Sequence, residues 1–292
     1  MFMLLETPTN FNDFELLDSG NGYRLERWGN VFLQRPDPQI IWQPSLEPTE
    51  WDKASAVFLS ASGEDKGRWD IKTPLPHPWI ISYKDIKFLL KLSPFKHTGL
   101  FAEQATQWNW MAEKVKGQKL KILNLFGYTG GATMVLAKAG CEVTHVDASK
   151  PAITWANDNF KLNNLPATSV RWILDDAVKF VKREFKRGVK YDGIIMDPPA
   201  FGHSPTGKTW KFNQDLPGLL NDCADLLSPD AKFLVINGYA TNSSALALNN
   251  VLEDAVKNRA NKLGGKIEFG ELCLKQKTGR LLSTGIFARW AK

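Results

Sequence analysis

The sequence predicts a Rossmann-like α/β fold, in which seven strands form a sheet with helices on both faces, after a small domain made mostly of strands. Three observations support this prediction. From about residue 100, buried apolar runs alternate with amphipathic runs of helical period, and such alternation produces a parallel sheet. The last segment is a strand, a turn and a strand. The first 90 or so residues hold short strand-like runs and frequent prolines, which rule out long helices.

The amino-terminal part, residues 1–94, is expected to be a small, mostly β domain and a candidate for binding RNA or another substrate. It contains strand-like runs such as "GYRLERWG", "NVFLQRP" and "WIISYKDIKFLLKLS". "GNG" and "YKDI" are typical of tight turns between strands. Residues 95–292 are expected to form the second domain.

The second domain is predicted to be a regular succession of helices and strands. It begins with the helix "FAEQATQWNWMAEKV", the strand "LKILNLF" and the helix "GATMVLAKAG". The strands "EVTHVD", "SVRWIL", "YDGIIMD" and "KFLVIN" follow, with helices between them. The helix that starts near residue 150 has Ser149 as its cap and Pro151 in its first turn, both favourable at a helix start.

The carboxyl-terminal segment closes the sheet. "KIEFGELCLKQ" and "LLSTGIFARW" are strands joined by a "KTGR" turn, with no helix between them. An antiparallel hairpin at the end of a parallel sheet distinguishes class I methyltransferases from dehydrogenases and P-loop proteins, by analogy at the level of the fold.

The composition describes a soluble, basic chain. The net charge is +6, and 11 tryptophans and 17 phenylalanines accompany it. Cations and exposed rings suit nucleic acid, although the rings can equally be core and the lysines solvated. No apolar run reaches the roughly 20 residues of a membrane span, and the start lacks the basic region of a signal peptide. Three distant cysteines indicate neither disulfides nor a zinc site. We expect a cytoplasmic protein without a metal or a membrane contact.

A glycine-rich turn follows the first strand of the second domain. Gly127, Gly130 and Gly131 permit positive φ angles and close backbone approach. A cofactor can then lie over the carboxyl end of the sheet. The spacing G-x-x-G-G differs from the dinucleotide pattern G-x-G-x-x-G. The alternative is a tight turn without a ligand.

Acidic residues end the next two strands. Asp147 closes "EVTHVD", twenty residues beyond Gly127, where a carboxylate can accept two hydrogen bonds from ribose hydroxyls. It can instead be an acid favoured at a helix amino terminus. In "ILDDAVKF", Asp175 or Asp176 could accept from an adenine amino group. Asp176 is preferred because it directly precedes Ala177, and it can also cap its helix.

The stretch "MDPPAFGHSPTGKT", residues 196–209, carries two incompatible motifs. Its second half matches the phosphate-binding pattern G-x-x-x-x-G-K-T. In that motif the first glycine stands at the end of a strand and the Lys-Thr pair opens a helix. Here the strand ends at Asp197, and two prolines come before Gly202. We therefore expect neither ATP nor GTP.

The first half of the same stretch fits a loop that holds a planar amine. The Asp197 carboxylate and a carbonyl of Pro198 or Pro199 can accept hydrogens from the amine, and Phe201 can stack on the base that carries it. These four residues are the catalytic candidates. Methyl transfer needs little acid–base chemistry, so in-line positioning supplies most of the rate. A rigid Pro-Pro strand exit is the alternative.

Several segments together resemble the class I S-adenosylmethionine-dependent ribosomal RNA methyltransferases of the RlmI-like group. They are "LNLFGYTGGATM", "VDASKPAITWANDNFKLN", "DDA" and "DPPAF". "PFKHTGLFAEQATQWNW" and "KTGRLLSTGIFARW" are similar to that group's first segment and closing hairpin. The resemblance covers about residues 90–292. It implies methyl transfer from S-adenosylmethionine to a base of ribosomal RNA.

The resemblance also implies residues for each role. Those implied for the cofactor are Phe101, Gln104, Phe126, Gly127, Tyr128, Thr129, Gly130, Gly131, Asp147, Ala148, Asp176, Ala177 and Asp197. Thr98 and Gly99 would line the same cleft, as would Lys96, which is also a candidate for RNA contact. The basic, aromatic segment after the amine loop adds Lys208, Trp210 and Lys211 as candidates for holding RNA.

The cysteines bear on which atom is methylated. Methylation of cytosine carbon-5 needs a thiolate that attacks the ring. In relatives that do so the cysteine follows strand five, where this chain has "INGYATNSS". Cys141, Cys223 and Cys273 are not obvious nucleophiles, so a nitrogen such as the exocyclic amine of guanine is favoured. Cytosine carbon-5, a protein amide, a small molecule and an idle RNA-binding protein stay as alternatives, and the oligomeric state is not predicted.

Overall fold

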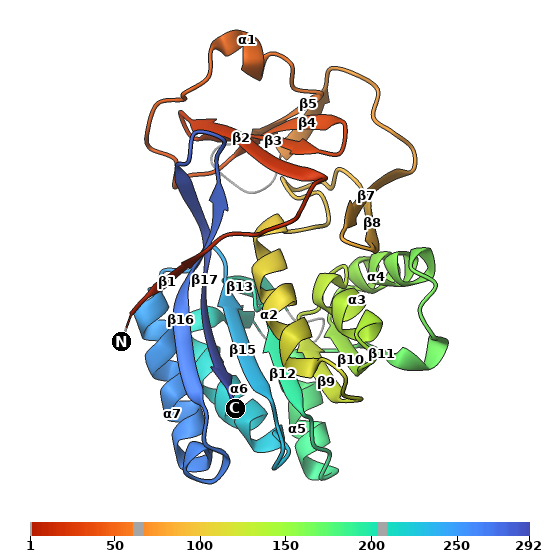
Figure 1. Cartoon of the computed structure of the whole chain (residues 1–292), viewed down its shortest axis with the longest axis vertical. Coiled ribbons are helices and arrows are strands. Elements are labelled where there is room, and N and C mark those ends of the chain that lie inside the picture. Colours follow the sequence, from red (N-terminus) through yellow and green to blue (C-terminus); the bar gives the residue numbers. More distant parts are fainter. Residues whose placement is uncertain (1, 61–66, 204–208) are drawn as a thin grey trace. The chain divides into compact units, whose positions relative to one another are not determined.

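The computed structural model describes residues 2–60, 67–203 and 209–292 (Figure 1). The chain forms two compact units. The α/β unit comprises Met1–Glu6, Thr106–Leu272 and Thr284–Lys292, and the β-rich unit comprises Thr7–Ala105 and Cys273–Ser283. Within the described part of the chain, no helix is both long and apolar enough to cross a membrane.

The α/β unit contains one eight-stranded sheet in the order β1-β16-β17-β15-β12-β9-β10-β11. Its parallel centre consists of β9 (Lys121–Leu125), β10 (Glu142–Asp147), β11 (Val170–Leu174), β12 (Gly193–Met196) and β15 (Phe233–Gly238). β17 (Leu281–Ala291) runs antiparallel to β15. β16 (Lys266–Lys275) follows, and β1 (Leu4–Glu6) pairs with it in parallel. The predicted α/β fold with a closing hairpin is confirmed, and β1 adds an eighth strand to the seven expected.

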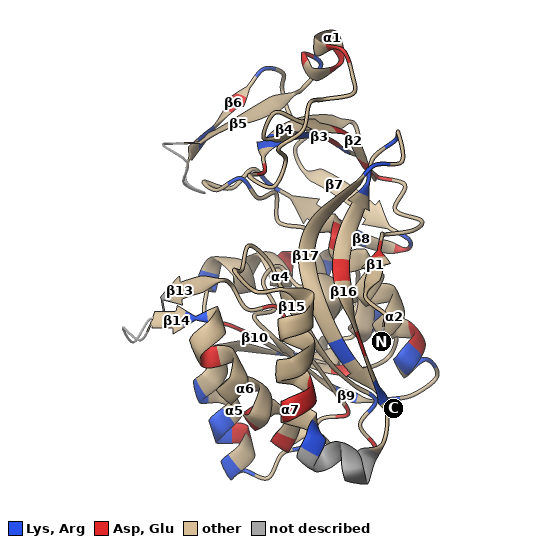
Figure 2. Ribbon diagram, turned by 90° about the vertical axis from the view of Figure 1, so that its left-hand side faces the viewer, with Lys and Arg blue, Asp and Glu red and all other residues tan. Residues whose placement is uncertain are grey.

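Helices cover both faces of this sheet. α5 (Ala177–Lys186), α6 (Phe212–Leu226) and α7 (Ala245–Leu263) lie on one face, and α2 (Ala105–Val115), α3 (Gly131–Lys138) and α4 (Lys150–Leu162) lie on the other (Figures 1 and 2). Phe180, Leu220 and Leu252 join the sheet residues Ile194 and Leu234 in one buried cluster. Each such side chain contributes about 1.5–3 kcal/mol by leaving water.

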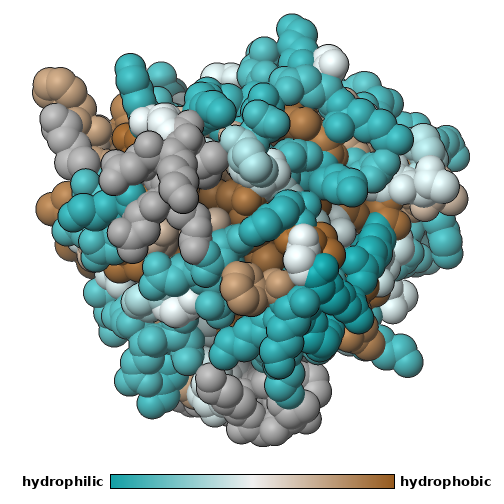
Figure 3. Space-filling view, turned by 90° about the horizontal axis from the view of Figure 1, so that it is seen from below, coloured by the Kyte–Doolittle hydropathy of each residue, from teal (hydrophilic) through white to brown (hydrophobic). Residues whose placement is uncertain are grey.

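The outer sides of the helices face solvent. Lys, Arg, Asp and Glu mark the solvent sides of α5 and α6 (Figure 2). The face seen from below is mainly hydrophilic, with hydrophobic side chains showing between the charged ones (Figure 3). The charged outer sides of α5 and α6 are the pattern of amphipathic helices that bury one stripe against a sheet.

The β-rich unit is built on a five-stranded sheet in the order β2-β3-β4-β5-β6. The strands are β2 (Phe14–Gly20), β3 (Tyr23–Trp28), β4 (Val31–Pro36), β5 (Ala56–Ser60) and β6 (Gly67–Ile71). A short helix, α1 (Pro48–Trp51), lies between β4 and β5, and the hairpin of β7 (Trp79–Tyr83) and β8 (Ile86–Leu90) follows. Trp28, Leu33, Phe58 and Phe88 form its fully buried core.

Two segments belong to a different unit from the residues next to them in the sequence. β1 belongs to the α/β unit, whereas the tip of the hairpin between β16 and β17 belongs to the β-rich unit. In that tip, Gln276 Nε2 donates to Asp18 Oδ1 at 2.6 Å, and Ser19 Oγ donates to Gln276 Oε1 at 2.8 Å. A single boundary at residue 94 therefore differs from the compact units in the placement of residues 1–6, 95–105 and 273–283.

Arg289 of β17 joins the edge strands of the α/β unit. Its guanidinium lies 2.6 Å from Glu6 Oε1 on β1 and 2.8 Å from Glu268 Oε2 on β16. It also donates to Gln107 Oε1 at 3.3 Å and lies 4.6 Å from the Trp110 ring centre. The Arg289 side chain is only 4% exposed, so its positive charge depends on the two carboxylates for compensation.

We predict that Arg289→Met lowers the free energy of unfolding by about 2 kcal/mol. Removing one partner of a buried ion pair costs more than this, but Glu6 and Glu268 retain some contact with water. Urea unfolding measures the change. The matched control is Lys116→Met, because the Lys116 side chain is 78% exposed, and its effect should stay below about 0.5 kcal/mol. Equal midpoints for Arg289→Met and the parent would contradict the prediction.

Candidate active site

The loop between β9 and α3 has an unusual backbone. Phe126 has a φ of 55°, Tyr128 of 49° and Gly130 of 86°. The left-handed conformation is costly for a residue with a side chain, and such residues cluster where a loop must hold a ligand. The expectation of a positive φ in this turn is correct for Gly130, and two aromatic residues share it.

The other two glycines of the loop are required by packing inside the protein. A Cβ on Gly127 would lie 2.5 Å from Cε1 of His145, and one on Gly131 would lie 2.6 Å from Cζ2 of Trp108. Both distances are shorter than any real contact. Gly127 and Gly131 therefore allow the loop to sit directly on two rings, a role that the sequence pattern did not separate from approach to a ligand.

A buried polar chain supports the loop from below. Asn124 Nδ2 donates to Thr133 Oγ1 at 2.9 Å, and Thr133 Oγ1 lies 2.8 Å from His145 Nδ1. Burial lowers the pKa of His145 to about 3, so the imidazole is neutral. The Thr133 hydroxyl can then accept from Asn124 and donate to Nδ1. His145 escaped the sequence-based prediction; the only signal was a histidine among apolar residues, two positions before Asp147.

Asp147 connects this loop to the start of α4. Its Oδ2 accepts from the Tyr128 amide at 2.8 Å, and its Oδ1 accepts from the Ser149 amide at 2.8 Å. Burial raises the pKa of the Asp147 carboxyl, and these two hydrogen bonds oppose the shift. A carboxylate has about four acceptor positions. Two remain for donors such as ribose hydroxyls, and the neighbouring Ala148 is exposed.

The carboxyl end of β11 lies beside Asp147. Asp176 accepts from the Lys179 amide at 3.0 Å and so caps α5, while Asp175 is paired with Arg183. Leu174 stands opposite Asp147 in the strand register and is 52% exposed. Sequence reasoning missed Leu174, although an apolar residue just before two acids at a strand end was a signal. Its surface suits a flat apolar ring.

The loop after β12 runs beside the end of β9. The Asp197 amide donates to the Leu125 carbonyl at 3.4 Å, Pro198 is buried, and Phe201 is 55% exposed. Trp210 Nε1 donates to the Pro199 carbonyl at 2.8 Å. The Trp210 ring also packs 5.4 Å from that of Phe126. Trp210, expected to contact RNA, thus ties the amine loop to the glycine-rich loop.

The segment that matches a phosphate-binding pattern has a different geometry. β13 (Phe201–His203) and β14 (Thr209–Lys211) pair as antiparallel strands, with Gly202 opposite Trp210. In a phosphate-binding loop the glycine would end a strand of the main sheet and the threonine would open a helix. α6 begins after Lys211, which is exposed. Lys208 lies outside the described residues.

The segment that precedes α2 belongs to the β-rich unit. Lys96, expected to contact RNA, is only 5% exposed, and its carbonyl accepts from Arg35 Nη1 at 3.1 Å. Arg35 also pairs with the buried Glu26 at 2.7 Å. Burial raises the pKa of Glu103 in the same segment. Lys96 therefore lies in the interior of this unit, whereas Phe101 and Gln104 are partly exposed.

The carboxyl ends of the four strands β9, β10, β11 and β12 therefore lie side by side at one end of the sheet. The residues gathered there are Phe126, Gly127, Tyr128, Thr129, Gly130, Gly131, Asp147, Ala148, Leu174, Asp176, Ala177, Asp197, Pro198, Pro199 and Phe201. In the described ranges, no three His, Cys, Asp or Glu side chains gather as a metal site would require.

Residues 61–271 match the model of a family described as S-adenosylmethionine-dependent methyltransferases. The chain belongs to this family. Its cofactor is accordingly S-adenosylmethionine. The solved structure of a methyltransferase of this kind from Agrobacterium tumefaciens is 39% identical to this methyltransferase, covers 99% of it and 93% of the other chain, and superposes with a TM-score of 0.92.

Two further similarities are more distant. A Streptococcus mutans methyltransferase structure, 16% identical, has a TM-score of 0.73 and covers 97% of this chain and 76% of that one. The curated "Ribosomal RNA large subunit methyltransferase K/L" of Shewanella frigidimarina is 34% identical over 153 residues. That match covers 52% of this chain but only 21% of the relative. The chain thus matches about a fifth of the length of this curated relative.

The buried His145 predicts a pH dependence of stability. In the unfolded chain its pKa returns to about 6.5, whereas the folded value is about 3. The unfolded state therefore binds more protons between these values, and stability that is present above pH 6.5 is lost as the pH falls. Between pH 7 and pH 5 the loss from His145 should be about 2 kcal/mol.

Unfolding by urea at both pH values tests this dependence. His145→Asn should lose about 2 kcal/mol less than the parent between pH 7 and pH 5. His77, which is exposed, provides the matched control, and His77→Asn should keep the parent's pH dependence. An identical loss in the parent and in His145→Asn would show that the imidazole does not carry the effect.

Proposed function

We propose that this methyltransferase transfers the methyl group of S-adenosylmethionine to a nitrogen of an unpaired base, in ribosomal RNA. The observation that carries the proposal is the position of the Asp197-Pro198-Pro199 loop directly beside the glycine-rich loop. The Asp197 amide reaches the last residue of β9, and Trp210 bridges Pro199 and Phe126. A substrate amine and a cofactor methyl can meet only where two such loops adjoin.

Residues of the glycine-rich edge fit the cofactor. The two acceptor positions of Asp147 that its amide partners leave open suit the ribose hydroxyls, and the exposed Leu174 offers a surface to the adenine. Asp176 and the Ala177 backbone would read the adenine edge, since capping uses only one oxygen of Asp176. The backbone of residues 126–131 would approach the part of the cofactor that lies beyond the ribose and the adenine. Bound S-adenosylmethionine supplies an activated methyl group on a sulfonium, an excellent leaving group.

The amine loop would hold the substrate. Because Trp210 engages the Pro199 carbonyl, the Asp197 carboxylate and the Pro198 carbonyl are the acceptors proposed for the hydrogens of the amine. These contacts withdraw the nitrogen lone pair from the ring and aim it at the methyl group. Phe201 offers an exposed ring for stacking. Positioning of this kind can lower a barrier by about 7–11 kcal/mol.

The RNA substrate is supported by charge and by relatives. The net charge of +6 suits phosphates, and Lys211 is exposed next to the amine loop. The curated relatives are named as ribosomal RNA methyltransferases. A base within a helix would have to be flipped out, at a cost of a few kcal/mol.

The cysteines favour a nitrogen over carbon-5 of cytosine. Cys141, Cys223 and Cys273 are all buried, at 1%, 0% and 2% exposed. Burial raises the pKa of Cys141 to about 11 and that of Cys223 further. A buried thiol with a raised pKa is a poor nucleophile. Carbon-5 chemistry would need a thiolate at the edge of the sheet.

The first prediction of this proposal concerns Asp147. Asp147→Ala should weaken the binding of S-adenosylmethionine about a hundredfold, since two charge-assisted hydrogen bonds contribute about 1.5 kcal/mol each. Calorimetry measures the affinity, and circular dichroism checks that the loop change leaves the fold intact. Asp254→Ala is the matched control, because Asp254 is an exposed acid on α7. An unchanged affinity in a folded Asp147→Ala protein would remove this residue from the site.

The second prediction concerns the transfer itself. With tritiated S-adenosylmethionine, the parent should label ribosomal RNA from cells that lack the gene, and digestion should yield an N-methylated nucleoside. Asp197→Ala should lose most of the transfer, whereas a variant with all three cysteines changed to serine should stay active if it folds. Label in protein or in a small molecule, or no label, would support the alternative substrates or an idle binding protein.

Cytosine carbon-5 would be indicated by a different pair of results. Loss of transfer in a single folded cysteine variant, together with a covalent complex trapped by the parent on RNA that contains 5-fluorocytosine, would show that the nitrogen assignment is wrong.

A further inference from the structure

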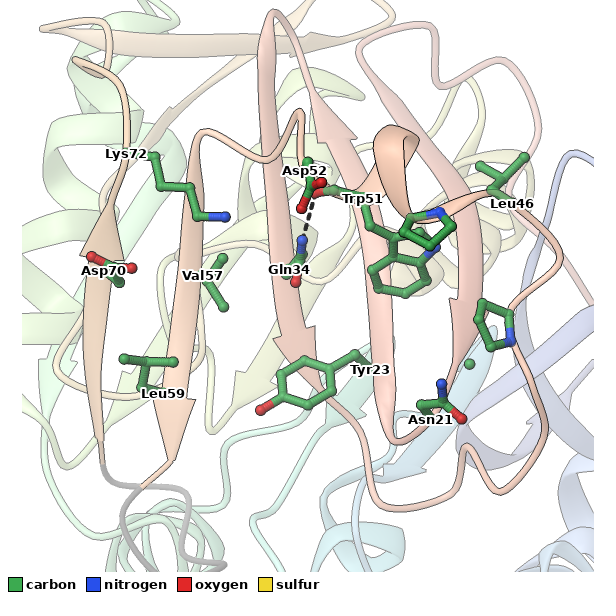
Figure 4. Close-up of a pocket in the computed structure, with 13 residues that line it drawn as sticks. Asn21, Tyr23, Gln34, Leu46, Trp51, Asp52, Val57, Leu59, Asp70 and Lys72 are labelled. Carbon is green, nitrogen blue, oxygen red and sulfur yellow. Dashed lines mark hydrogen bonds between the residues drawn. The ribbon is translucent and has the colours of Figure 1, made fainter.

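The β-rich unit contains a cavity of about 500 Å³ on one face of its five-stranded sheet (Figure 4). Residues of all five strands, of α1 and of the loop before it surround the cavity, and β2 contributes only the backbone of Gly20. Its aromatic residues are Tyr23 and Trp51, its aliphatic residues are Val57, Leu59 and Leu46, and Asn21, Gln34, Asp52, Asp70 and Lys72 contribute polar groups.

Strand register explains why these side chains share a face. Gln34 stands opposite Val57, and Val57 stands opposite Asp70, so the three form a row across β4, β5 and β6. Directly opposed residues on paired strands point to the same side. The neighbours Leu33 and Phe58 point to the other side and are fully buried. The cavity therefore lies on the face that the core does not use.

One wall of the cavity is fixed in advance. Trp51 Nε1 donates to Asp18 Oδ2 at 3.0 Å, and the Leu46 amide donates to the same oxygen at 2.8 Å. Gln34 Nε2 donates to the Trp51 carbonyl at 2.6 Å. Asp18 is completely buried, so these bonds are shielded from water. A preformed wall lowers the entropy cost of binding.

The charges on the open side alternate along β6 and just beyond it. Arg68, Asp70 and Lys72 are two residues apart, so their side chains leave the same face, and all three are exposed. Along this strand the Asp70 carboxylate thus stands between two cations, above aliphatic and aromatic surface, and Asp52 adds a second carboxylate beside α1. This is the complement of a nucleotide, which has a flat ring, N–H donors on its edge and an anionic phosphate on each side.

We propose that this cavity binds an unpaired nucleotide of the RNA substrate, a proposal that rests on the function inferred above. The base stacks on Tyr23, whose ring lines the cavity (Figure 4). The Asp70 carboxylate accepts from the edge of the base, and Arg68 and Lys72 contact the flanking phosphates. Sheet faces with accessible rings bind unpaired bases by such stacking. Guanine fits best, because its adjacent imino and amino donors match the two oxygens of one carboxylate.

Binding of short single strands to the full chain tests the site. The probes are fluorescein-labelled U4GU4 and U9 RNA, followed by anisotropy. Tyr23→Leu should bind U4GU4 about tenfold more weakly than the parent, because it loses the ring and keeps the bulk. Tyr23→Phe should restore binding. Asp70→Asn should reduce the preference for U4GU4 over U9, and ultraviolet cross-links should map to Tyr23 or Trp51.

Several outcomes would overturn the site. They are parental affinity in Tyr23→Leu, cross-links confined to other residues, and a dimer in the parent that Tyr23→Leu dissociates without an effect on RNA, which would identify a second copy as the occupant. Methyl transfer separates this proposal from the previous one. If the parent methylates RNA and Tyr23→Leu has an unchanged KM for it, only this site is wrong. If the parent binds through Tyr23 but methylates no RNA, only the proposed function is wrong.

Discussion

The candidate site of the α/β unit depends on the hydrogen bonds that the Asp147 carboxylate accepts. It accepts one backbone amide from the glycine-rich loop and one from the start of α4, both at 2.8 Å. The amides belong to residues that follow two adjacent strands, so the carboxylate fixes both strand exits together. Its partial burial strengthens these bonds, because competing water is scarce. The strained φ angles of Phe126 and Tyr128 persist because contacts such as these hold the loop in place.

Two supports reinforce that loop from opposite sides. The Asn124–Thr133–His145 chain lies beneath it, and the ring of His145 leaves no room for a side chain on Gly127. Trp210 contacts it from the side of the amine loop. Because both loops contact the Trp210 ring, their separation is fixed, as the proposed in-line transfer would require.

The β-rich unit is held together by its own contacts. Its ion network of Glu26 and Arg35 binds the backbone at Lys96, in the segment that leads into α2. Its sheet uses one face for the core and leaves the other with Tyr23, Asp70 and Lys72 around a cavity. The five-stranded sheet thus buries apolar side chains on one face and has polar and aromatic side chains on the other.

The sequence by itself determined the order of strands and helices, the glycine-rich turn, the acid at the end of β10 and the amine loop after β12. Hydrophobic periodicity, glycines and prolines determine the conformation of the local backbone, so these features can be predicted from residues close together in the sequence. The closing hairpin was equally local. The two prolines before the G-x-x-x-x-G-K-T match likewise predict locally that its first glycine does not end a strand of the main sheet, and Gly202 lies instead in the short strand β13.

Only the tertiary structure decided how distant residues meet. The pairing of β1 with β16 joins residues more than 250 positions apart, and no local pattern encodes such a contact. The burial of Lys96, the ring of His145 beneath Gly127 and the bond from Trp210 to Pro199 are of the same kind. Each depends on which side chain packing brings close. Residue type alone limits what a lysine, a histidine or a tryptophan can do, and the neighbours that folding supplies select among those possibilities.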